Sequence, residues 1–258
     1  MKKTDYPIRT QVMNHQEYTY MFHAEETMWW YVGLRNVINY YISQRGTHMR
    51  ILDAGCGTGK NMQFLKEKGH NVYGIDIGQQ AIALCKKRGL KQVYKGSIDT
   101  IPFPDSSFDC VVATDVLGVF TDQEGAKKAL RELYRVVKLG GLLLLHCSAF
   151  SCLHSPHDHT TRILKRYTKK ELISLLGKKW VVQKISYRIF FLFFPVAMVK
   201  WTKQYLPFLH LPKTDHYQPP RILNIIFTGI QLSENYLLRF IDFPVGSSMI
   251  VVARKRIA

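Results

Sequence analysis

Three glycines spaced two residues apart, with an aspartate just ahead of them, are the residues best suited to chemistry in this sequence. Residues 51–61 read ILDAGCGTGKN, an apolar run followed by a glycine-rich loop and a helix-like segment. Gly55 and Gly57 let the backbone approach a ligand closely, and Gly59 lets the helix start tight against the strand. Such a loop is typical of nucleotide sites, although a glycine repeat alone is weak support.

The aspartate ahead of the loop indicates which ligand the loop suits. In dinucleotide-binding proteins, the N-terminus of the helix faces a pyrophosphate. A carboxylate at Asp53 would repel that anion and attract a cation. S-adenosylmethionine (SAM) carries an ammonium and a sulfonium group, so Asp53 favours SAM over a dinucleotide.

Two later strand ends complete the expected nucleoside site. Asp76 follows the glycine loop by about 20 residues and is placed to accept hydrogen bonds from ribose hydroxyls, while Ile77 would pack on adenine. The Ile98 N–H is expected to donate to adenine. Ser97 or Asp99 would accept from the adenine amino group.

After residue 49, short apolar runs alternate with helix-like segments, as in repeated βα units. Continuous runs such as VVAT at 111–114 and LLLL at 142–145 are typical of parallel strands covered by helices on both faces. This pattern predicts an α/β fold. Helices are expected over residues 60–68, 79–88, 124–137 and 168–176. The glycines of KLGG, residues 138–141, are expected to end the third of these helices.

The rest of the chain is expected to surround this core as parts of one domain over residues 1–258. Its parts are an aromatic cap at 1–48, helical over 17–44, a SAM-binding core at 49–148, and acceptor-side elements at 149–258. The last two strands are expected over 180–187 and 247–254. Residues 188–244 therefore form an insert before the last strand.

The insert contains the apolar run IFFLFFPVAMV, residues 189–199, between Arg188 and Lys200. A helix needs about 20 apolar residues to cross a bilayer, so this run is too short. With its basic flanks and Trp201, the run is expected to lie on a membrane or to line a lipid pocket. A buried helix or an ordinary hydrophobic lid is the alternative.

Charge and cysteine usage limit the partners. The formal net charge is +17, and residues 161–258 hold 17 Lys and Arg against 4 Asp and Glu. This basic third is interpreted as facing an anionic membrane surface or acceptor, with a merely solvated surface as the alternative. Nucleic acid is suggested by charge alone and is not expected. The cysteine spacing predicts no metal site, and a reduced, cytoplasmic protein without a signal peptide is expected.

The motifs DAGCGTG, GIDI, IPFPDSSFD and LRELYRVVKLGG resemble, in order and spacing, class I SAM-dependent methyltransferases of the type 11 or UbiE-like kind over residues 50–148. WW-Y-x-x-x-R at 29–35, HD at 157–158 and RYT at 166–168 resemble methyltransferases of polysaccharide and lipid-glycan gene clusters. The resemblance implies a Rossmann-like, seven-stranded, mostly parallel sheet with an antiparallel last strand and helices on both faces. It also implies S-adenosylhomocysteine as the product.

The resemblance assigns the cofactor contacts residue by residue. They are Arg35, Asp53, Gly55, Gly57, Thr58, Gly59, Asp76, Ile77, Ser97, Ile98, Asp99 and Thr114. Arg35 would reach the methionine carboxylate, with an ordinary surface arginine as the alternative. The chain departs from the family at residues 116–119, where VLGV replaces VLEH and removes a histidine that faces the acceptor.

The expected reaction is methyl transfer to a hydroxyl of a sugar or glycan, which could be lipid-linked. The methyl group of SAM is already activated, so the protein mainly orients the acceptor and excludes water. A hydroxyl acceptor also needs a base, for which His157 with Asp158 beside it is the candidate. Histidines 154, 157 and 159 without a catalytic role, or His157 and Asp158 as a structural pair, are the alternatives. A quinone or isoprenoid acceptor and a catalytically silent SAM-binding protein are the competing hypotheses.

Overall fold

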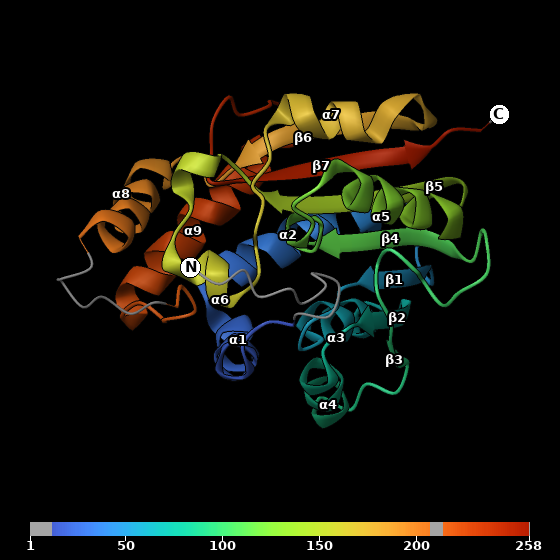
Figure 1. The fold of residues 1–258 in the computed structure, drawn as a ribbon, viewed down its shortest axis with the longest axis horizontal. Helices are drawn as coiled ribbons and strands as arrows, with labels where there is room; N and C mark the ends of the chain where they lie inside the picture. The colour runs from blue at the N-terminus through green and yellow to red at the C-terminus, as the bar shows by residue number, and fades with distance from the viewer. Residues whose placement is uncertain (1–11, 207–213, 258) are drawn as a thin grey trace, which may run out of the picture.

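A seven-stranded sheet in the order β3-β2-β1-β4-β5-β7-β6 forms the centre of the molecule (Figure 1). The structure is a computed structural model that describes residues 12–206 and 214–257. Its strands are β1 (Arg50–Ala54), β2 (Asn71–Asp76), β3 (Val93–Lys95), β4 (Phe108–Thr114), β5 (Val137–Ser148), β6 (Trp180–Arg188) and β7 (Ser248–Lys255). Strands β1 to β5 pair in parallel, whereas β7 runs antiparallel to both β5 and β6. The predicted Rossmann-like sheet is confirmed.

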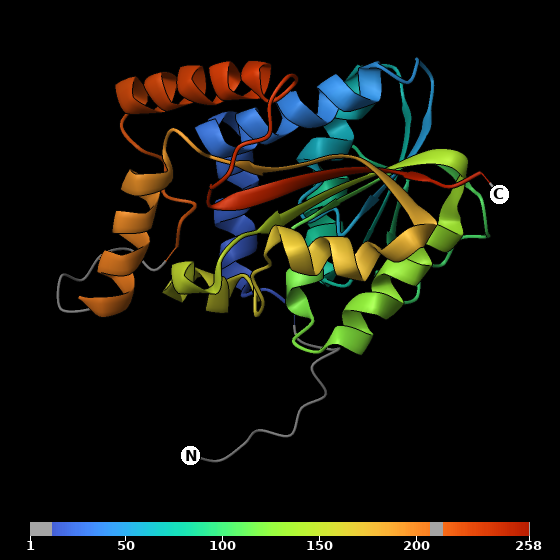
Figure 2. The ribbon, with the colours of Figure 1, turned by 90° about the horizontal axis from the view of Figure 1, so that it is seen from above.

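Helices cover both faces of this sheet. They are α1 (His15–Thr27), α2 (Trp29–Ser43), α3 (Lys60–Glu67), α4 (Gln79–Lys87), α5 (Gln123–Val136), α6 (Pro156–Thr160), α7 (Lys169–Leu176), α8 (Phe193–Tyr205) and α9 (Arg221–Leu237). Figure 2 shows α2 and α9 side by side on one face and α5 and α7 on the other. The leucines at 142–145 are almost completely buried between these layers, as their continuous apolar run predicts.

The connection between α5 and β5 differs from the prediction. The helix ends at Val136, because Val137 is already extended, with φ −75° and ψ 135°, and begins β5. The glycines lie inside the strand, where Gly140 has a φ of +70°. The pairing of β5 with β4 is irregular between Phe108 and Cys110. These glycines therefore kink a strand, and their expected role as a helix cap is wrong.

The N-terminal cap and the insert pack against each other. The segment expected to be helical over 17–44 consists of two helices, α1 and α2, separated at the extended residue Met28. The insert supplies α8 and α9, and Asn235 of α9 donates a hydrogen bond of 2.7 Å to the carbonyl of Gly33 in α2. The beginning of the expected cap, residues 1–11, lies outside the described residues.

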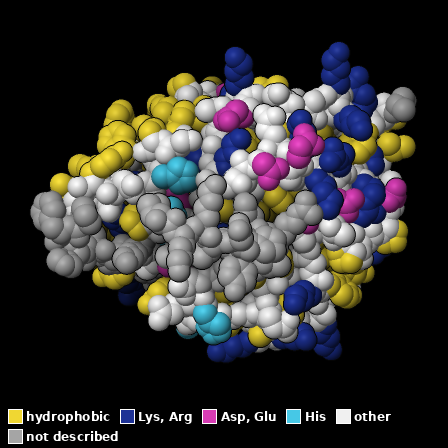
Figure 3. Space-filling model, viewed as in Figure 1, with side chains coloured by type: hydrophobic (Ala, Val, Ile, Leu, Met, Phe, Trp, Pro, Cys, Tyr) yellow, Lys and Arg dark blue, Asp and Glu magenta, His cyan; other side chains and the backbone are white. Residues whose placement is uncertain are grey.

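The apolar run of the insert is not flanked by exposed cations, contrary to expectation. Arg188 is fully buried, where its guanidinium donates to Gln231, and Lys200 is also buried and pairs with Asp215 at 2.8 Å. Lys200 thus has a counter-charge, whereas Nε and Nη1 of Arg188 have no hydrogen-bond partner among the described residues. Figure 3 shows hydrophobic side chains gathered at the end of the molecule where α8 lies, with Lys and Arg mostly elsewhere. Within the described residues, no helix has the length and apolarity needed to span a membrane.

Candidate functional site

A cavity of about 1100 Å³ runs from the strand ends to the insert. We call the part lined by the glycine loop and the ends of β2 and β4 the cofactor end. The part lined by α8 and residues 214–220 is called the acceptor end. Eight of the predicted cofactor residues line the cavity: Gly55, Gly57, Asp76, Ile77, Ser97, Ile98, Asp99 and Thr114. Arg35, Asp53, Thr58 and Gly59 are not among its lining residues.

The glycine loop is compact because side chains from two other segments press against it. Gly55 has a φ of +82°, and a Cβ there would lie 2.0 Å from a methyl group of Val116. The N–H of Gly57 donates to Asp76 at 2.9 Å, and the N–H of Gly78 donates to the other carboxylate oxygen at 2.7 Å. Burial raises the pKa of Asp76 to about 6, although these backbone donors oppose the shift. Each oxygen of Asp76 retains a lone pair for a further donor.

Asp53 and Arg35 are buried with unused hydrogen-bonding atoms. Neither carboxylate oxygen of Asp53, nor Nη1 of Arg35, has a partner among the described residues. Burial, followed by the charges of Glu25 and Asp76, raises the pKa of Asp53 to about 8. Arg35 is only 6% exposed, so the alternative of a surface arginine is wrong. Buried polar groups without partners are rare, and this pair matches the ammonium and carboxylate of an amino acid.

At the third strand end, the two residues expected to accept from adenine are joined to each other. The hydroxyl of Ser97 donates to Asp99 at 2.5 Å, and Lys128 lies 3.5 Å from the other oxygen of that carboxylate. Ile98 is buried beside them and lines the cavity. Asp99 therefore has a fixed orientation at this end of the cavity.

Helix α1 lies over the glycine loop, which the sequence analysis missed. Tyr18, Met21 and Glu25 of this helix line the cavity. Glu25 accepts a hydrogen bond from the Thr58 hydroxyl and pairs with Arg88 at 3.4 Å. Burial raises the pKa of Glu25 to about 7, although Thr58 and Arg88 oppose the shift. The spacing of residues in α1 contains no signal for this contact, because its partner is more than thirty residues away.

Asp115, directly after β4, is a second residue that the motifs did not identify. It lines the cavity and has a φ of +56°, a sparsely populated conformation that often marks functional positions. His146 lies 2.9 Å from one carboxylate oxygen, and the hydroxyl of Ser148 donates to the other at 3.1 Å. Burial would raise the pKa of Asp115, but these partners hold it below its ordinary value. Asp115 is therefore an ionised carboxylate at the cofactor end.

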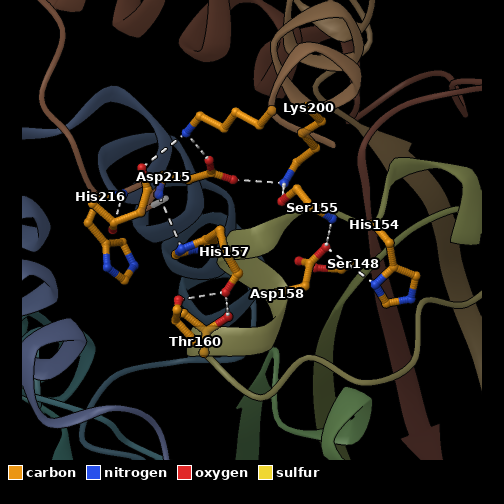
Figure 4. Close-up of polar contacts among 12 residues, drawn as sticks. Ser148, His154, Ser155, His157, Asp158, Thr160, Lys200, Asp215 and His216 are labelled. Atoms are coloured by element: carbon orange, nitrogen blue, oxygen red, sulfur yellow. Dashed lines mark hydrogen bonds and ion pairs between the residues drawn. The ribbon is translucent and has the colours of Figure 1, made fainter. Parts of the chain in front are cut away.

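His157 and Asp158 both line the cavity, but they do not pair with each other (Figure 4). The carboxylate of Asp158 accepts three hydrogen bonds from Arg166, of 2.8, 3.0 and 3.1 Å, and one from the N–H of Ser155 at the start of α6. Nδ1 of His157 accepts from the N–H of Asp215 at 3.1 Å, and burial lowers the pKa of this imidazole to about 4. Adjacent helix residues point in different directions, so the two side chains of this candidate base have separate partners.

A polar cluster at the acceptor end joins three segments that are distant in the sequence. Oε2 of Glu17 lies 3.0 Å from Nδ1 of His216, and the hydroxyl of Tyr31 lies 2.8 Å from Nε2 of the same ring. Thr160 and Thr214 also donate to the carboxylate of Glu17. Glu17, His157 and His216 place ligand atoms within 4.8 Å of one another, a grouping that could also hold a metal ion.

The rest of the acceptor end is mainly apolar. Its wall includes Ile189, Leu192, Pro195, Val196, Val199 and Phe227. The two lysines of α8 that reach the cavity, Lys200 and Lys203, both pair with Asp215 at 2.8 Å. The acceptor end therefore combines an apolar chamber with one polar cluster.

A family model described as "Methyltransferase domain" matches residues 52–145, which include the glycine loop, Asp76 and Asp115. Residues 52–145 are therefore similar to a methyltransferase domain, and the matched part covers strands β1 to β4 and most of β5. This similarity and the fold imply SAM as the cofactor.

Curated relatives match the chain over about 100 residues. A malonyl-[acyl-carrier protein] O-methyltransferase from Serratia marcescens is 32% identical over 110 residues, 42% of this chain and 42% of that protein. The ubiquinone/menaquinone biosynthesis C-methyltransferase UbiE from Vibrio cholerae is 34% identical over 106 residues, 37% of this chain and 40% of that protein. This chain thus covers less than half of these relatives.

A solved SAM-dependent methyltransferase from Thermotoga maritima shares the fold over nearly the whole chain. The TM-score is 0.58 at 18% identity, with 93% of this chain and 96% of that chain covered. The likeness extends to the cap and the insert, which the family model does not include.

Proposed function

We propose that the protein transfers the methyl group of SAM to a hydroxyl of an acceptor that carries an apolar portion. The two-ended cavity is the observation that supports this proposal. Its cofactor end is built from glycines and buried carboxylates, and its acceptor end is an apolar chamber with a polar cluster. An amphipathic molecule is the ligand that suits such a chamber.

The residues at the cofactor end fit SAM. Asp53 would hold the ammonium and Arg35 the carboxylate, since both are buried with atoms that lack partners among the described residues. Asp76 would accept the ribose hydroxyls, and Ile77 and Ile98 would enclose adenine. When bound, SAM supplies a methyl group that is already activated by a positively charged sulfur. Asp115 would add negative charge near that cation.

The expected sugar hydroxyl of a lipid-linked glycan fits this description, because its polar and apolar parts match the two parts of the acceptor end. A quinone or isoprenoid is the second candidate, and the predominance of apolar residues such as Leu192, Val196 and Phe227 favours it. The names of the curated relatives point to a malonyl thioester and a quinone as the acceptors of those proteins.

We also propose that α8 and α9 contact a membrane surface, from which an apolar acceptor would enter. Phe194 and Met198 of α8 are 78% and 63% exposed, and Ile222 of α9 is 73% exposed. Large exposed apolar patches mark sites of protein or membrane contact. Because Arg188 and Lys200 are buried, the proposed contact depends on apolar side chains more than on attraction to anionic headgroups.

Methyl-labelled SAM incubated with the purified protein and a fractionated membrane lipid extract tests the proposal. Label in the lipid-linked glycan fraction would support the first acceptor, and label in the quinone and isoprenoid fraction would select the second. Label that appears only in water-soluble molecules would contradict both. SAM binding by calorimetry without turnover on any fraction would favour a catalytically silent SAM-binding protein.

A further inference from the structure

We propose that Tyr31, His216 and Glu17 form a proton relay that removes the proton of the acceptor hydroxyl during methyl transfer. This inference rests on the proposed function, because only a hydroxyl acceptor needs a base. It replaces His157 and Asp158 as the candidate base with residues from α1, α2 and the segment before α9.

The hydrogen bonds of the cluster determine which atom carries each proton. The ionised carboxylate of Glu17 can only accept, so Nδ1 of His216, 3.0 Å away, carries a proton and donates to it. With its proton on Nδ1, the neutral ring has a lone pair on Nε2, which accepts from the Tyr31 hydroxyl at 2.8 Å. The tyrosine hydroxyl thus donates to the histidine ring, and the ring donates to the carboxylate. The same order is found where a base activates a nucleophile and a carboxylate orients the base.

The protonation states that the relay needs follow from the surroundings. Burial, together with the charges of Glu25, Asp115 and Glu17, raises the pKa of Tyr31 well above its ordinary value, so the phenol is protonated at rest. Burial would raise the pKa of Glu17, but hydrogen bonds from His216 and Thr214 lower it overall. The carboxylate is therefore ionised and can stabilise a positive charge on the imidazole.

The relay lies where the two ends of the cavity meet. Tyr31 and His216 both line the cavity. The charges that act on Tyr31 come from Glu25 and Asp115 at the cofactor end and from Glu17 at the acceptor end. A hydroxyl that reaches the phenolic oxygen of Tyr31 would therefore stand between the cofactor residues and the apolar chamber.

The transfer balances with these groups alone. The acceptor oxygen forms a bond to the methyl carbon while the carbon–sulfur bond breaks, and the electron pair of that bond goes to sulfur. The acceptor proton passes to the oxygen of Tyr31, and the phenolic proton passes to Nε2 of His216. The imidazolium is stabilised by Glu17 until it releases the proton to water.

The neighbours of His216 leave Glu17 as its main counter-charge. The ring of His157 is 4.8 Å away in an edge contact, and burial lowers its pKa to about 4, so it is neutral. Lys200 and Lys203 are engaged with Asp215. A metal ion held by Glu17, His157 and His216 would have to displace the hydrogen bonds that these three side chains already make, so the structure favours the relay.

Kinetics of four variants test the relay. Tyr31→Phe and His216→Asn are expected to lower kcat by about a hundredfold or more, with SAM affinity by calorimetry unchanged. For Glu17, which acts through His216, Glu17→Asp should retain much more activity than Glu17→Gln, and KM for the acceptor should change little. His159→Gln, an exposed histidine of the same region, is the matched control and should retain full activity. If the wild type turns over the acceptor and both Tyr31→Phe and His216→Asn retain its kcat, the relay is wrong. That result would leave the proposed methyl transfer intact.

Nitrogen NMR of the free protein gives a readout that does not depend on turnover. His216 should be protonated on Nδ1 in the wild type, and Glu17→Gln should shift the ring toward the other tautomer. Protonation on Nε2 in the wild type would contradict the relay even if no acceptor is found. Loss of activity on chelation, restored by a divalent cation, would instead assign the cluster to a metal.

Discussion

The two ends of the cavity are built in different ways from the chain. Most of the cofactor end is assembled from short motifs at the carboxyl ends of strands, to which α1 adds Tyr18, Met21 and Glu25. The acceptor end brings together Glu17, Tyr31, His157 and His216, and the bond between Glu17 and His216 spans 199 residues. A local motif therefore identifies the first end, whereas only the packing of cap against insert creates the second.

The two ends of the cavity also differ in how their charged side chains are paired. At the cofactor end, neither carboxylate oxygen of Asp53 has a hydrogen-bond partner among the described residues, which suits a cationic ligand that supplies one. At the acceptor end, ionised groups such as Asp215 and Lys200 already neutralise each other. We therefore expect changes at the first end to affect SAM and changes at the second to affect the acceptor.

The largest expected effect is that of Asp53→Asn on SAM binding. Removing one member of a buried charge pair costs about 2–5 kcal/mol, so the Kd for SAM should rise by at least about 30-fold. Without SAM, the variant should have nearly the stability of the wild type at neutral pH, since both side chains are then mainly uncharged and buried without partners. Calorimetry and urea unfolding measure the two effects. An unchanged Kd would show that the cation lies elsewhere.

The pH dependence of SAM binding should sharpen this result. The pKa of Asp53 is raised to about 8 in the free protein, so the protonated form stabilises the fold, and this stability is lost as the pH rises through about 8. A bound cation favours the ionised form, so SAM should bind more tightly as the pH rises from about 5.5 to 7.5, with release of protons. Calorimetry in buffers of different ionisation enthalpy counts these protons. The slope should be shallower in Asp53→Asn, where Glu25 still titrates near pH 7.

The contrast between the cofactor end and the acceptor end explains which parts of the molecule could be predicted from the sequence. The sheet, the glycine loop and the strand-end carboxylate Asp76 depend on local patterns, and the structure places them at one end of the cavity. His157 with Asp158 beside it was the candidate base because the two are adjacent, but partners such as Arg166 and Asp215 decide where the two side chains point. Arg188 was interpreted as a basic flank of the apolar run, and its burial against α9 cannot be read from that run alone.

The acceptor end should respond to a change that leaves SAM binding intact. Val196 of α8 lines the apolar chamber, and Val196→Asn would bury an amide without partners at a cost of about 1–3 kcal/mol. The KM for a detergent-solubilised acceptor should rise by about tenfold, while the Kd for SAM stays the same. Parallel changes in both constants would mean that the two ends are not separate.

The smallest expected effect concerns the outer side of the same helix. Met198 is 63% exposed and is not among the residues that line the cavity, so Met198→Asn is the matched partner of Val196→Asn. It should weaken binding to lipid vesicles by about fivefold, because one partly buried apolar side chain contributes about 1 kcal/mol. Turnover of the solubilised acceptor should not change.

Vesicle flotation with zwitterionic and anionic lipids would also separate the two membrane mechanisms. Binding driven by apolar side chains should occur on both lipids, whereas binding only to anionic vesicles would point to the basic surface instead of α8.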